Sequence, residues 1–289
     1  MDVQMLIFIS FGFHFLSMIL CTNIKVLFGT KFHIKELDVD TGNVKLLVTN
    51  PEIMFAMDYD DKNKHIYFTQ YDHRKIMQFP YPAQNAVIEK FVNTGSGPAG
   101  IAIDSENGHV YWTEYQSNRL MRCSVARNNE VHITTLTSPF SVRIDVLNRW
   151  LYVAERFARI IKARFNYSEA HGIVDLKTRV DYMDLDRNED KLYWTTFHYP
   201  GNLKSASVRG CDVKTLYTTG HTDQFCPIGV YGGAIFYTSN KNLLMLNKTE
   251  RHSPTSVYTD SNNIYSIYVY HQRDVLRNKI KTTANAQEK

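Results

Sequence analysis

The side chains that most often carry chemistry, cysteine and histidine, are widely spaced in this chain. Its four cysteines, Cys21, Cys123, Cys211 and Cys226, include no CxxC pair. A zinc site or a scaffold built on disulfides needs closer or more regular spacing. The cysteine pattern therefore predicts neither, and Cys123, inside an apolar strand, is expected to serve as a core residue.

The histidines give no better indication of a reaction. His65, His109, His198, His221 and His271 stand alone, and no Ser/His/Asp arrangement accompanies them. Nucleophilic catalysis and metal binding both need several such groups in one place. We therefore predict a protein that is not an enzyme and that holds no cofactor or metal ion.

Composition points instead to contact surfaces made of aromatic rings. Aromatic residues make up 13% of the chain, including 18 Tyr and 16 Phe, and such rings favour β-strands. The 33 basic and 29 acidic residues nearly balance, which leaves a formal charge of +4 without a dense Lys/Arg tract. Nucleic acid is therefore not an expected partner. The elements that position the rings are expected to be the strands of an all-β fold.

A recurring tetrapeptide organises those strands. Its five copies are Tyr67-Phe68-Thr69-Gln70, Tyr111-Trp112-Thr113-Glu114, Tyr152-Val153-Ala154-Glu155, Tyr193-Trp194-Thr195-Thr196 and Phe236-Tyr237-Thr238-Ser239. Successive copies begin 44, 41, 41 and 43 residues apart. A period near forty is typical of propeller blades, each made of four strands. The WD40 type is excluded because none of the three tryptophans is followed by Asp.

A hairpin is expected before the tetrapeptide in each repeat. In four copies an acid stands seven residues before the first Tyr and is followed by a turn-forming Asn; these acids are Asp60, Asp104, Asp145 and Asp186. In the fifth copy, Gly232-Gly233 can supply the positive φ values that a tight hairpin requires. Each repeat therefore predicts a strand, a turn, the tetrapeptide strand and two further strands.

Five motifs are visible, but the length of the repeat region fits six blades. The sixth blade is expected to be assembled from both ends of the chain. Its strands would be Lys25 to Gly29, His33 to Asp38, Val44 to Val48 and, from the C-terminal end, Ile264 to His271. Such closure leaves no long unpaired edge, so truncation at either end is expected to be severely destabilising.

These features resemble a known repeat. The tetrapeptides, with Val26-Leu27-Phe28-Gly29-Thr30 and Ile267-Tyr268-Val269-Tyr270-His271, are similar to the low-density lipoprotein receptor class B, or YWTD, repeat. The resemblance covers residues 25–272 and implies a six-bladed propeller closed by a split blade, as in the low-density lipoprotein receptor-related protein family. The Asp that usually ends the tetrapeptide is absent from every copy, where Gln70, Glu114, Glu155, Thr196 and Ser239 replace it.

The two ends of the chain are expected to lie outside the propeller. Residues 1–22 contain an apolar run suited to a secretory signal peptide or a short apolar anchor. Residues 273–289 form a polar tail, expected to be disordered, where the family usually continues with a cysteine-rich module. We predict an extracellular or secreted propeller or a truncated receptor. A membrane-anchored form, with the propeller outside, requires the apolar run to stay uncleaved.

The loops after the tetrapeptides and the loops that lead into the inner strands are expected to share one rim, called here the top face. These loops carry Phe32, Phe55, Tyr71, Tyr115, Phe140, Phe157, Phe197, His198 and Phe225. Aromatic rings provide large contact areas and are enriched at interaction hot spots. We therefore predict a ring of aromatic side chains that binds an extracellular protein ligand, with packing between blades as the alternative role.

The opposite rim, the bottom face, is expected to carry two glycosylation sequons. Asn166-Tyr167-Ser168 and Asn247-Lys248-Thr249 both fall between the third and fourth strands of their blades. Glycans on Asn166 and Asn247 would leave the top face free. Cys211 is expected on this rim and Cys226 on the top one, about 15 Å apart across one strand, which is too far for a disulfide.

Three functions fit these features. The resemblance implies an extracellular binding module for a lipoprotein, a Wnt-pathway antagonist or a laminin-like matrix protein. Basic residues in the top loops, Arg74, Arg119, Arg156 and Lys241, are compatible with a negatively charged ligand. A structural propeller that docks in the matrix is the second possibility. A calcium-dependent hydrolase is the third, and it is disfavoured because the inner strands read as mostly apolar.

Overall fold

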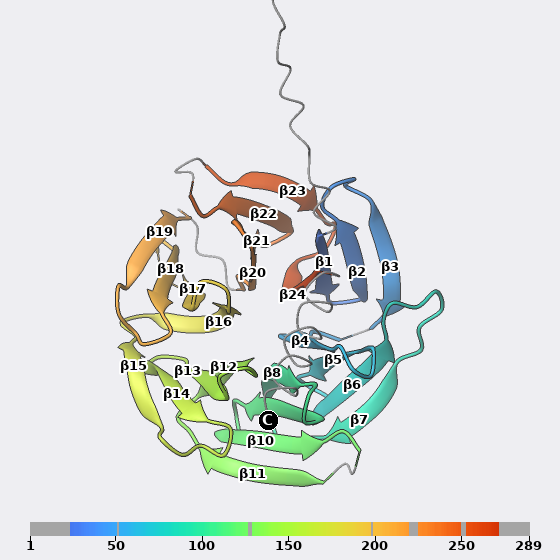
Figure 1. The fold of residues 1–289 in the computed structure, drawn as a ribbon. Coiled ribbons are helices and arrows are strands. Elements are labelled where there is room, and N and C mark those ends of the chain that lie inside the picture. The colour runs from blue at the N-terminus through green and yellow to red at the C-terminus, as the bar shows by residue number, and fades with distance from the viewer. Residues whose placement is uncertain are drawn as a thin grey trace, which may run out of the picture.

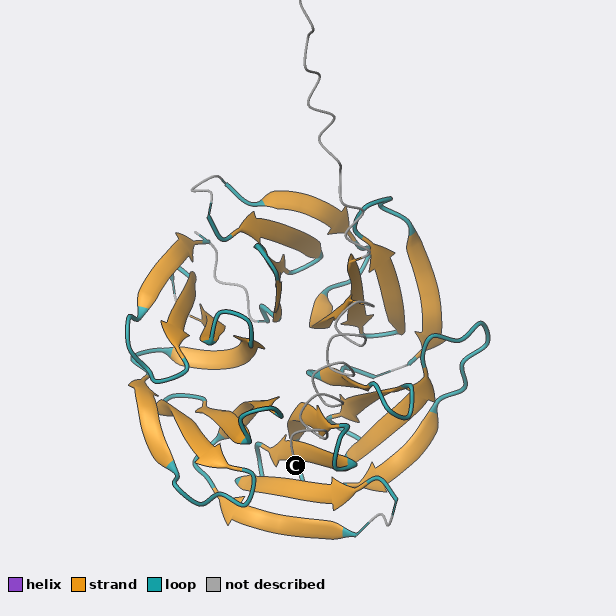
Figure 2. Cartoon of the chain, in the orientation of Figure 1, coloured by secondary structure: helices purple, strands orange, loops and turns teal. Residues whose placement is uncertain are grey.

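The computed structural model describes residues 24–50, 52–126, 129–197, 199–219, 225–249 and 253–271. The regular secondary structure within these ranges consists of β-strands alone. The strands form six four-stranded antiparallel sheets. Figure 1 shows the sheets as blades of a closed ring, and Figure 2 shows the strands with their connecting loops. The predicted all-β, six-bladed propeller is confirmed. The predicted signal or anchor segment and the polar tail lie outside the described residues.

The blades are numbered in chain order. Blade 1 contains β4 (Met57–Asp60), β5 (His65–Gln70), β6 (Lys75–Pro80) and β7 (Glu89–Asn93). Blade 2 contains β8 (Pro98–Asp104), β9 (His109–Glu114), β10 (Arg119–Ser124) and β11 (Glu130–Thr135). Blade 3 contains β12 (Pro139–Asp145), β13 (Trp150–Glu155), β14 (Arg159–Arg164) and β15 (His171–Asp175). Blade 4 contains β16 (Arg179–Asp186), β17 (Lys191–Phe197), β18 (Asn202–Ser207) and β19 (Lys214–Thr218). Blade 5 contains β20 (Ile228–Tyr231), β21 (Ala234–Ser239), β22 (Asn242–Asn247) and β23 (Thr255–Thr259).

Blade 6 closes the ring with strands from both ends of the propeller. It contains β24 (Ile264–His271), β1 (Ile24–Thr30), β2 (His33–Asp38) and β3 (Val44–Thr49). β24 pairs antiparallel with β1 from Ile24 opposite His271 to Gly29 opposite Ser266. The red β24 lies beside the blue β1 in Figure 1. The split sixth blade, predicted from the repeat count, is confirmed almost residue for residue.

The tetrapeptide lies at or near the end of the second strand in blades 1–5 and supplies packing between blades. Successive side chains of a strand point to opposite faces. Tyr111 accordingly packs in the cluster between blades 2 and 3, and Trp112 packs in the cluster between blades 1 and 2. Both are fully buried. Rings at these two positions therefore fill the wedge-shaped spaces on either side of the blade.

The third residue of the tetrapeptide joins each blade to the next through its hydroxyl. Thr113 Oγ1 donates to Phe140 O in blade 3 at 2.7 Å and accepts from Gly100 N in its own blade at 2.8 Å. Thr69 and Thr195 make the same donor contact to the following blade. Because these atoms are buried, the hydroxyl satisfies polar groups that water does not reach. The third position of the tetrapeptide therefore links neighbouring blades by a hydrogen bond.

The hairpin before the tetrapeptide is built around a buried carboxylate. The Asp104 carboxylate accepts a hydrogen bond from the backbone N–H of Asn107 at 3.2 Å and another from the Asn107 side-chain Nδ2. The next residue, Gly108, adopts a φ of 62°. Asp60 and Asp145 organise their turns in the same way. In blade 5, Gly232 replaces this device with a two-residue turn at a φ of 54°. The predicted hairpins are therefore present.

The innermost strands carry charged side chains, so the expectation of mostly apolar inner strands, which disfavoured a hydrolase, needs correction. Asp58 on β4 accepts from Ile103 N of blade 2 at 2.8 Å. Asp184 on β16 accepts from Val230 N of blade 5 and from Arg143 Nε on β12, both at 2.8 Å. Asp58 and Asp184 each stand two residues before a hairpin acid, Asp60 or Asp186, and only the hairpin acids are part of a local turn pattern. Asp58 and Asp184 tie neighbouring blades together around the axis.

Candidate functional site

Five of the predicted top-face rings gather into one cluster. The ring of Phe55 lies 5.1 Å from Tyr71, 5.5 Å from Phe140 and 5.3 Å from Phe225, measured between centroids. Tyr115 lies 5.8 Å from Phe140. Phe140 lies in strand β12 of blade 3, and the other four come from loops of blades 1, 2 and 5. The prediction that such loops share one rim therefore holds for this group.

The other described rings of the prediction, Phe32, Phe157 and Phe197, form no ring–ring pair with that cluster, so the arrangement is not the continuous ring expected from the loops. Phe32, Phe157 and Phe197 are 43%, 60% and 37% exposed. Phe140 is instead buried, and its role is largely packing. His198 lies outside the described residues. The site is better described as a central cluster, with exposed rings further out on blades 3, 4 and 6.

Two arginines and one aspartate complete the site. Arg156 follows the tetrapeptide of blade 3, and Arg179 and Asp181 begin the inner strand of blade 4. Both guanidinium groups donate to the Asp181 carboxylate, Arg156 through Nε and through Nη2 at 2.7 Å, and Arg179 through Nε at 2.9 Å and through Nη2. Asp181 is 4% exposed. One buried carboxylate therefore forms ion pairs with two arginines.

β-Bulges place Asp181 and Phe140 outside the regular strand pairing. The register of β16 against β17 shifts between Val180 and Tyr182, so Asp181 has no partner residue across the ladder. The register of β12 shifts in the same way around Phe140. A bulge re-aims the extra side chain out of the ladder. The local signal for this site is an Arg-x-Asp sequence at the start of an inner strand; of the site's three charged residues, only Arg156 was predicted to lie in a top-face loop.

The arginines also stack on the aromatic rings. The Arg156 guanidinium carbon lies 4.4 Å from the Phe140 centroid and 4.8 Å from that of Tyr115, and Arg179 lies 4.6 Å from Phe197. Attraction between a cation and a ring face is stronger where water is excluded. The stacking fixes the planes of both guanidinium groups, so the site is preorganised.

Burial controls the ionisation of Asp181. Loss of hydration raises the pKa of this carboxyl to about 6, and the Arg156 guanidinium opposes the rise. The group is therefore ionised at neutral pH. Beside it, a recess of about 260 Å³ is open to the top face, lined by Phe55, Tyr71, Phe140, Arg156, Arg179 and Phe225. The recess combines apolar walls with two cations.

The two sequons lie where the strand order predicted, between the third and fourth strands of blades 3 and 5. Asn166 and Asn247 are exposed. In each sequon the hydroxyl of the third residue donates to the Asn Oδ1, Ser168 at 2.7 Å and Thr249 at 2.9 Å. Use of either Asn as a glycan attachment point stays a prediction.

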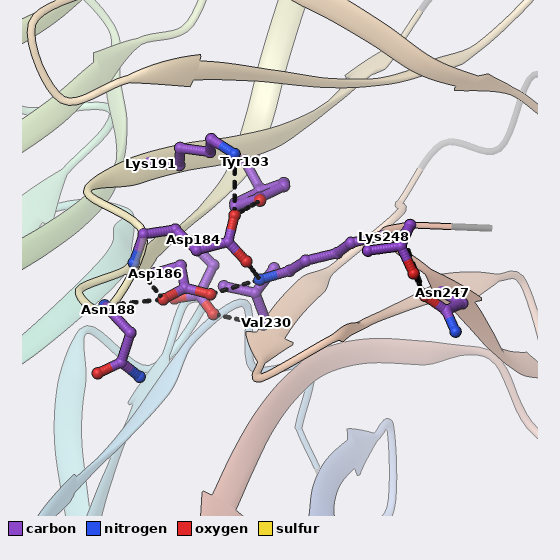
Figure 3. Close-up of polar contacts among 10 residues, drawn as sticks. Asp184, Asp186, Asn188, Lys191, Tyr193, Val230, Asn247 and Lys248 are labelled. Atoms are coloured by element: carbon purple, nitrogen blue, oxygen red, sulfur yellow. Dashed lines mark hydrogen bonds and ion pairs between the residues drawn. The ribbon is translucent and has the colours of Figure 1, made fainter. Parts of the chain in front are cut away.

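Lys248, the middle residue of the second sequon, joins blade 5 to blade 4, as Figure 3 shows. Its buried ammonium pairs with Asp186, donates to Glu189 Oε1 at 2.8 Å and lies 4.8 Å from the Tyr193 ring centroid. Lys191 and the Tyr193 hydroxyl also donate to Glu189. Burial opposes ionisation, but these donors lower the pKa of Glu189 to about 2. This network on the bottom face links blades 4 and 5 through ion pairs and hydrogen bonds.

Three of the four cysteines lie in the described residues. Cys123 is buried, Cys211 is exposed and Cys226 is half-buried, whereas Cys21 lies outside the described residues. The absence of a Cys211–Cys226 disulfide stays a prediction. Burial raises the pKa of the Cys123 thiol to about 11, consistent with a core role. Across the described ranges, no three His, Cys, Asp or Glu side chains are grouped so as to hold a metal ion.

The fold defines the class: the molecule is a six-bladed β-propeller. Neither a family model nor a curated protein sequence matches the chain. Among solved structures, it is similar to the crystal structure of a nidogen/laminin complex, with a TM-score of 0.75 and 14% sequence identity. The match covers 85% of this chain and 98% of the other. At this identity the similarity shows the fold. Membership of the receptor-related family stays a prediction.

Proposed function

We propose that this chain is an extracellular, non-catalytic propeller that binds a protein ligand on its top face over blades 3 and 4. The supporting observation is the recess with its stacked arginines, next to the exposed rings of Phe157, Phe197 and Tyr199. Exposed aromatic side chains beside a preformed recess are typical of interaction hot spots. The bottom face, by contrast, carries the two sequons.

The partner is proposed to be an extracellular matrix protein. The similar structure is a complex of nidogen with laminin, so laminin is the first protein to test with this chain. A structural docking role in the matrix and a ligand-binding role would both require the same top-face contact with a partner protein, so one binding experiment tests both. A lipoprotein and a Wnt-pathway antagonist are the other ligands that the repeat suggests, and fold alone does not choose among them.

Binding to immobilised laminin and to a panel of purified matrix proteins tests this proposal. The secreted propeller is compared with Tyr115→Ala and Phe197→Ala, which remove rings from the top face. Leu147→Ala is the matched control because Leu147 is an exposed apolar residue in a bottom-face turn. Saturable binding weakened by the first two changes and kept by the third is expected. Binding unaffected by the top-face changes would refute the proposed face.

The non-catalytic part of the proposal has its own test. Purified protein is analysed for bound metal and assayed for esterase and lactonase activity. The proposal expects neither stoichiometric calcium nor turnover. Stoichiometric calcium together with turnover would favour a hydrolase and would contradict the binding role.

A further inference from the structure

The charge in the top-face recess is incompletely balanced. Arg156 and Arg179 carry two positive charges, and both direct their Nε and Nη2 groups at the single carboxylate of Asp181. The three side chains together therefore keep one positive charge at neutral pH. The side chains of Arg156, Arg179 and Asp181 are 10%, 17% and 4% exposed. Water therefore screens this net charge poorly.

Both guanidinium groups keep hydrogen-bond donors for a ligand. A guanidinium has five N–H groups, and the bonds to Asp181 leave the Nη1 group of each arginine unused by that carboxylate. Stacking on Phe140 and Phe197 holds the two planes in place. A group that binds here gains directed donors without having to order them first.

The shape and walls of the recess limit what can enter. Phe55, Tyr71, Phe140 and Phe225 form apolar walls that suit the methylene groups of a side chain. A lysine or arginine of a partner would be repelled by the two guanidinium groups. A neutral amide would leave the net positive charge unbalanced in a site with little water. A carboxylate satisfies both the charge and the donors, and its planar geometry matches a guanidinium.

We infer that the top-face recess receives an aspartate or glutamate side chain of the partner protein, which binds beside Arg179 and Arg156 while the flanking rings of Phe157 and Phe197 contact neighbouring apolar residues. This inference rests on the proposed function, because it names the chemistry of the segment that the top face recognises. It describes an acidic and apolar loop of the partner as the bound element.

Selection of displayed random peptides on the full chain tests the inference. Peptides enriched on the wild-type propeller are sequenced and resynthesised with each Asp or Glu changed to Asn or Gln. Enrichment of one acidic position, and a loss of about tenfold or more in affinity on its neutralisation, are expected. Enriched peptides without an acidic position, or peptides that bind equally after neutralisation, would overturn the inference.

Variants of the propeller locate the effect. Arg179→Gln removes one cation and leaves Arg156 paired with Asp181, so the fold is expected to survive; circular dichroism checks this. The control Arg119→Gln removes the same charge from an exposed top-face position outside the recess. Weaker binding of acidic peptides by the first variant alone supports the inference. An equal loss in both variants would mean general attraction and would overturn it.

The same peptides separate this inference from the proposed function. If binding depends on Phe157 and Phe197 but not on an acidic residue or on Arg179, the top face is the binding surface and the inference about the carboxylate is wrong. If acidic peptides bind regardless of Phe157, Phe197 and Arg179, the proposed face itself is wrong, and the inference fails with it.

Discussion

The threonine at the third position of the tetrapeptide has the most clearly defined role of the motif residues. Thr113 bridges Gly100 N and Phe140 O, whereas the buried hydroxyl of Thr238, its counterpart in blade 5, has no hydrogen-bond partner among the described residues. The same side chain at the same motif position therefore makes different contributions in two blades. Blade 3 has Ala154 there, and Ser141 instead contacts the next blade through Met183.

Replacing each threonine by valine tests this difference. Thr113→Val leaves a buried N–H and a buried carbonyl unsatisfied and is expected to cost about 1–3 kcal/mol in the free energy of unfolding. Thr238→Val removes an unpartnered hydroxyl and is expected to cost little or to stabilise. Urea titration followed by circular dichroism measures both values. Equal losses would show that the hydroxyl bridge contributes nothing specific.

Glu189 is expected to control part of the acid stability. Its folded-state pKa of about 2 is below the unfolded value, so its contribution is present above about pH 4.5 and is lost as the pH falls towards 2. The melting temperature of the wild type should fall more between pH 6 and pH 2 than that of Glu189→Gln. The control is Glu106→Gln, an exposed acid in the corresponding turn of blade 2. Parallel curves for wild type and Glu189→Gln would contradict the expectation.

At the scale of strands, the close approach of inner strands sets a steric limit. Gly100 on β8 faces β12, and a Cβ on Gly100 would lie 2.5 Å from Phe140 O and 2.8 Å from Val142 N. Backbone atoms of a neighbouring blade cannot move aside cheaply. Gly233, in the hairpin between β20 and β21, has nothing within 4 Å of such a Cβ.

Gly100→Ala is therefore expected to destabilise the protein by about 1–3 kcal/mol, as overpacking of a core does. Gly233→Ala is the matched control and should change the unfolding free energy by less than about 0.5 kcal/mol. Chemical denaturation monitored by tryptophan fluorescence checks both. A tolerated Gly100→Ala would mean that the blades can separate more easily than their contacts imply.

The strands were largely predictable from the chain, and the site was only partly so. The tetrapeptide and the turn residues mark the second strand and its hairpin, because both depend on local periodicity and backbone conformation. Phe140 and Phe55 come together across blades, and no local pattern encodes that distance. Asp181 was missed because a bulge, not the strand alternation, aims it at Arg156 and Arg179. Such bulges depend on how two blades pack.

At the scale of the whole molecule, closure of the ring determines cooperative stability. β24 pairs with β1 over its length and packs against the inner strands of the neighbouring blades 1 and 5. Without it, blade 6 loses its inner strand and its neighbours expose apolar surface. The ring therefore has to fold as one unit, although its repeats are local.

Ending the chain at Asn263 removes β24 and tests closure. This variant is expected to lose a single cooperative thermal transition, because surfaces of blades 1, 5 and 6 that β24 covers open to water. It is compared with a variant that ends at His271 and keeps every described strand. Circular dichroism and limited proteolysis report the result. A sharp transition at an unchanged temperature in the shorter variant would show that the other five blades are sufficient.

We propose above that the top face over blades 3 and 4 is the binding surface. Hydrogen–deuterium exchange of the propeller, with and without saturating laminin or the first panel protein that binds, tests it most directly. We expect slower exchange in peptides that cover residues 137–140, 155–158 and 179–182. Slower exchange confined to the bottom-face turns at 145–149 and 187–190, with the top-face peptides unchanged, would contradict it.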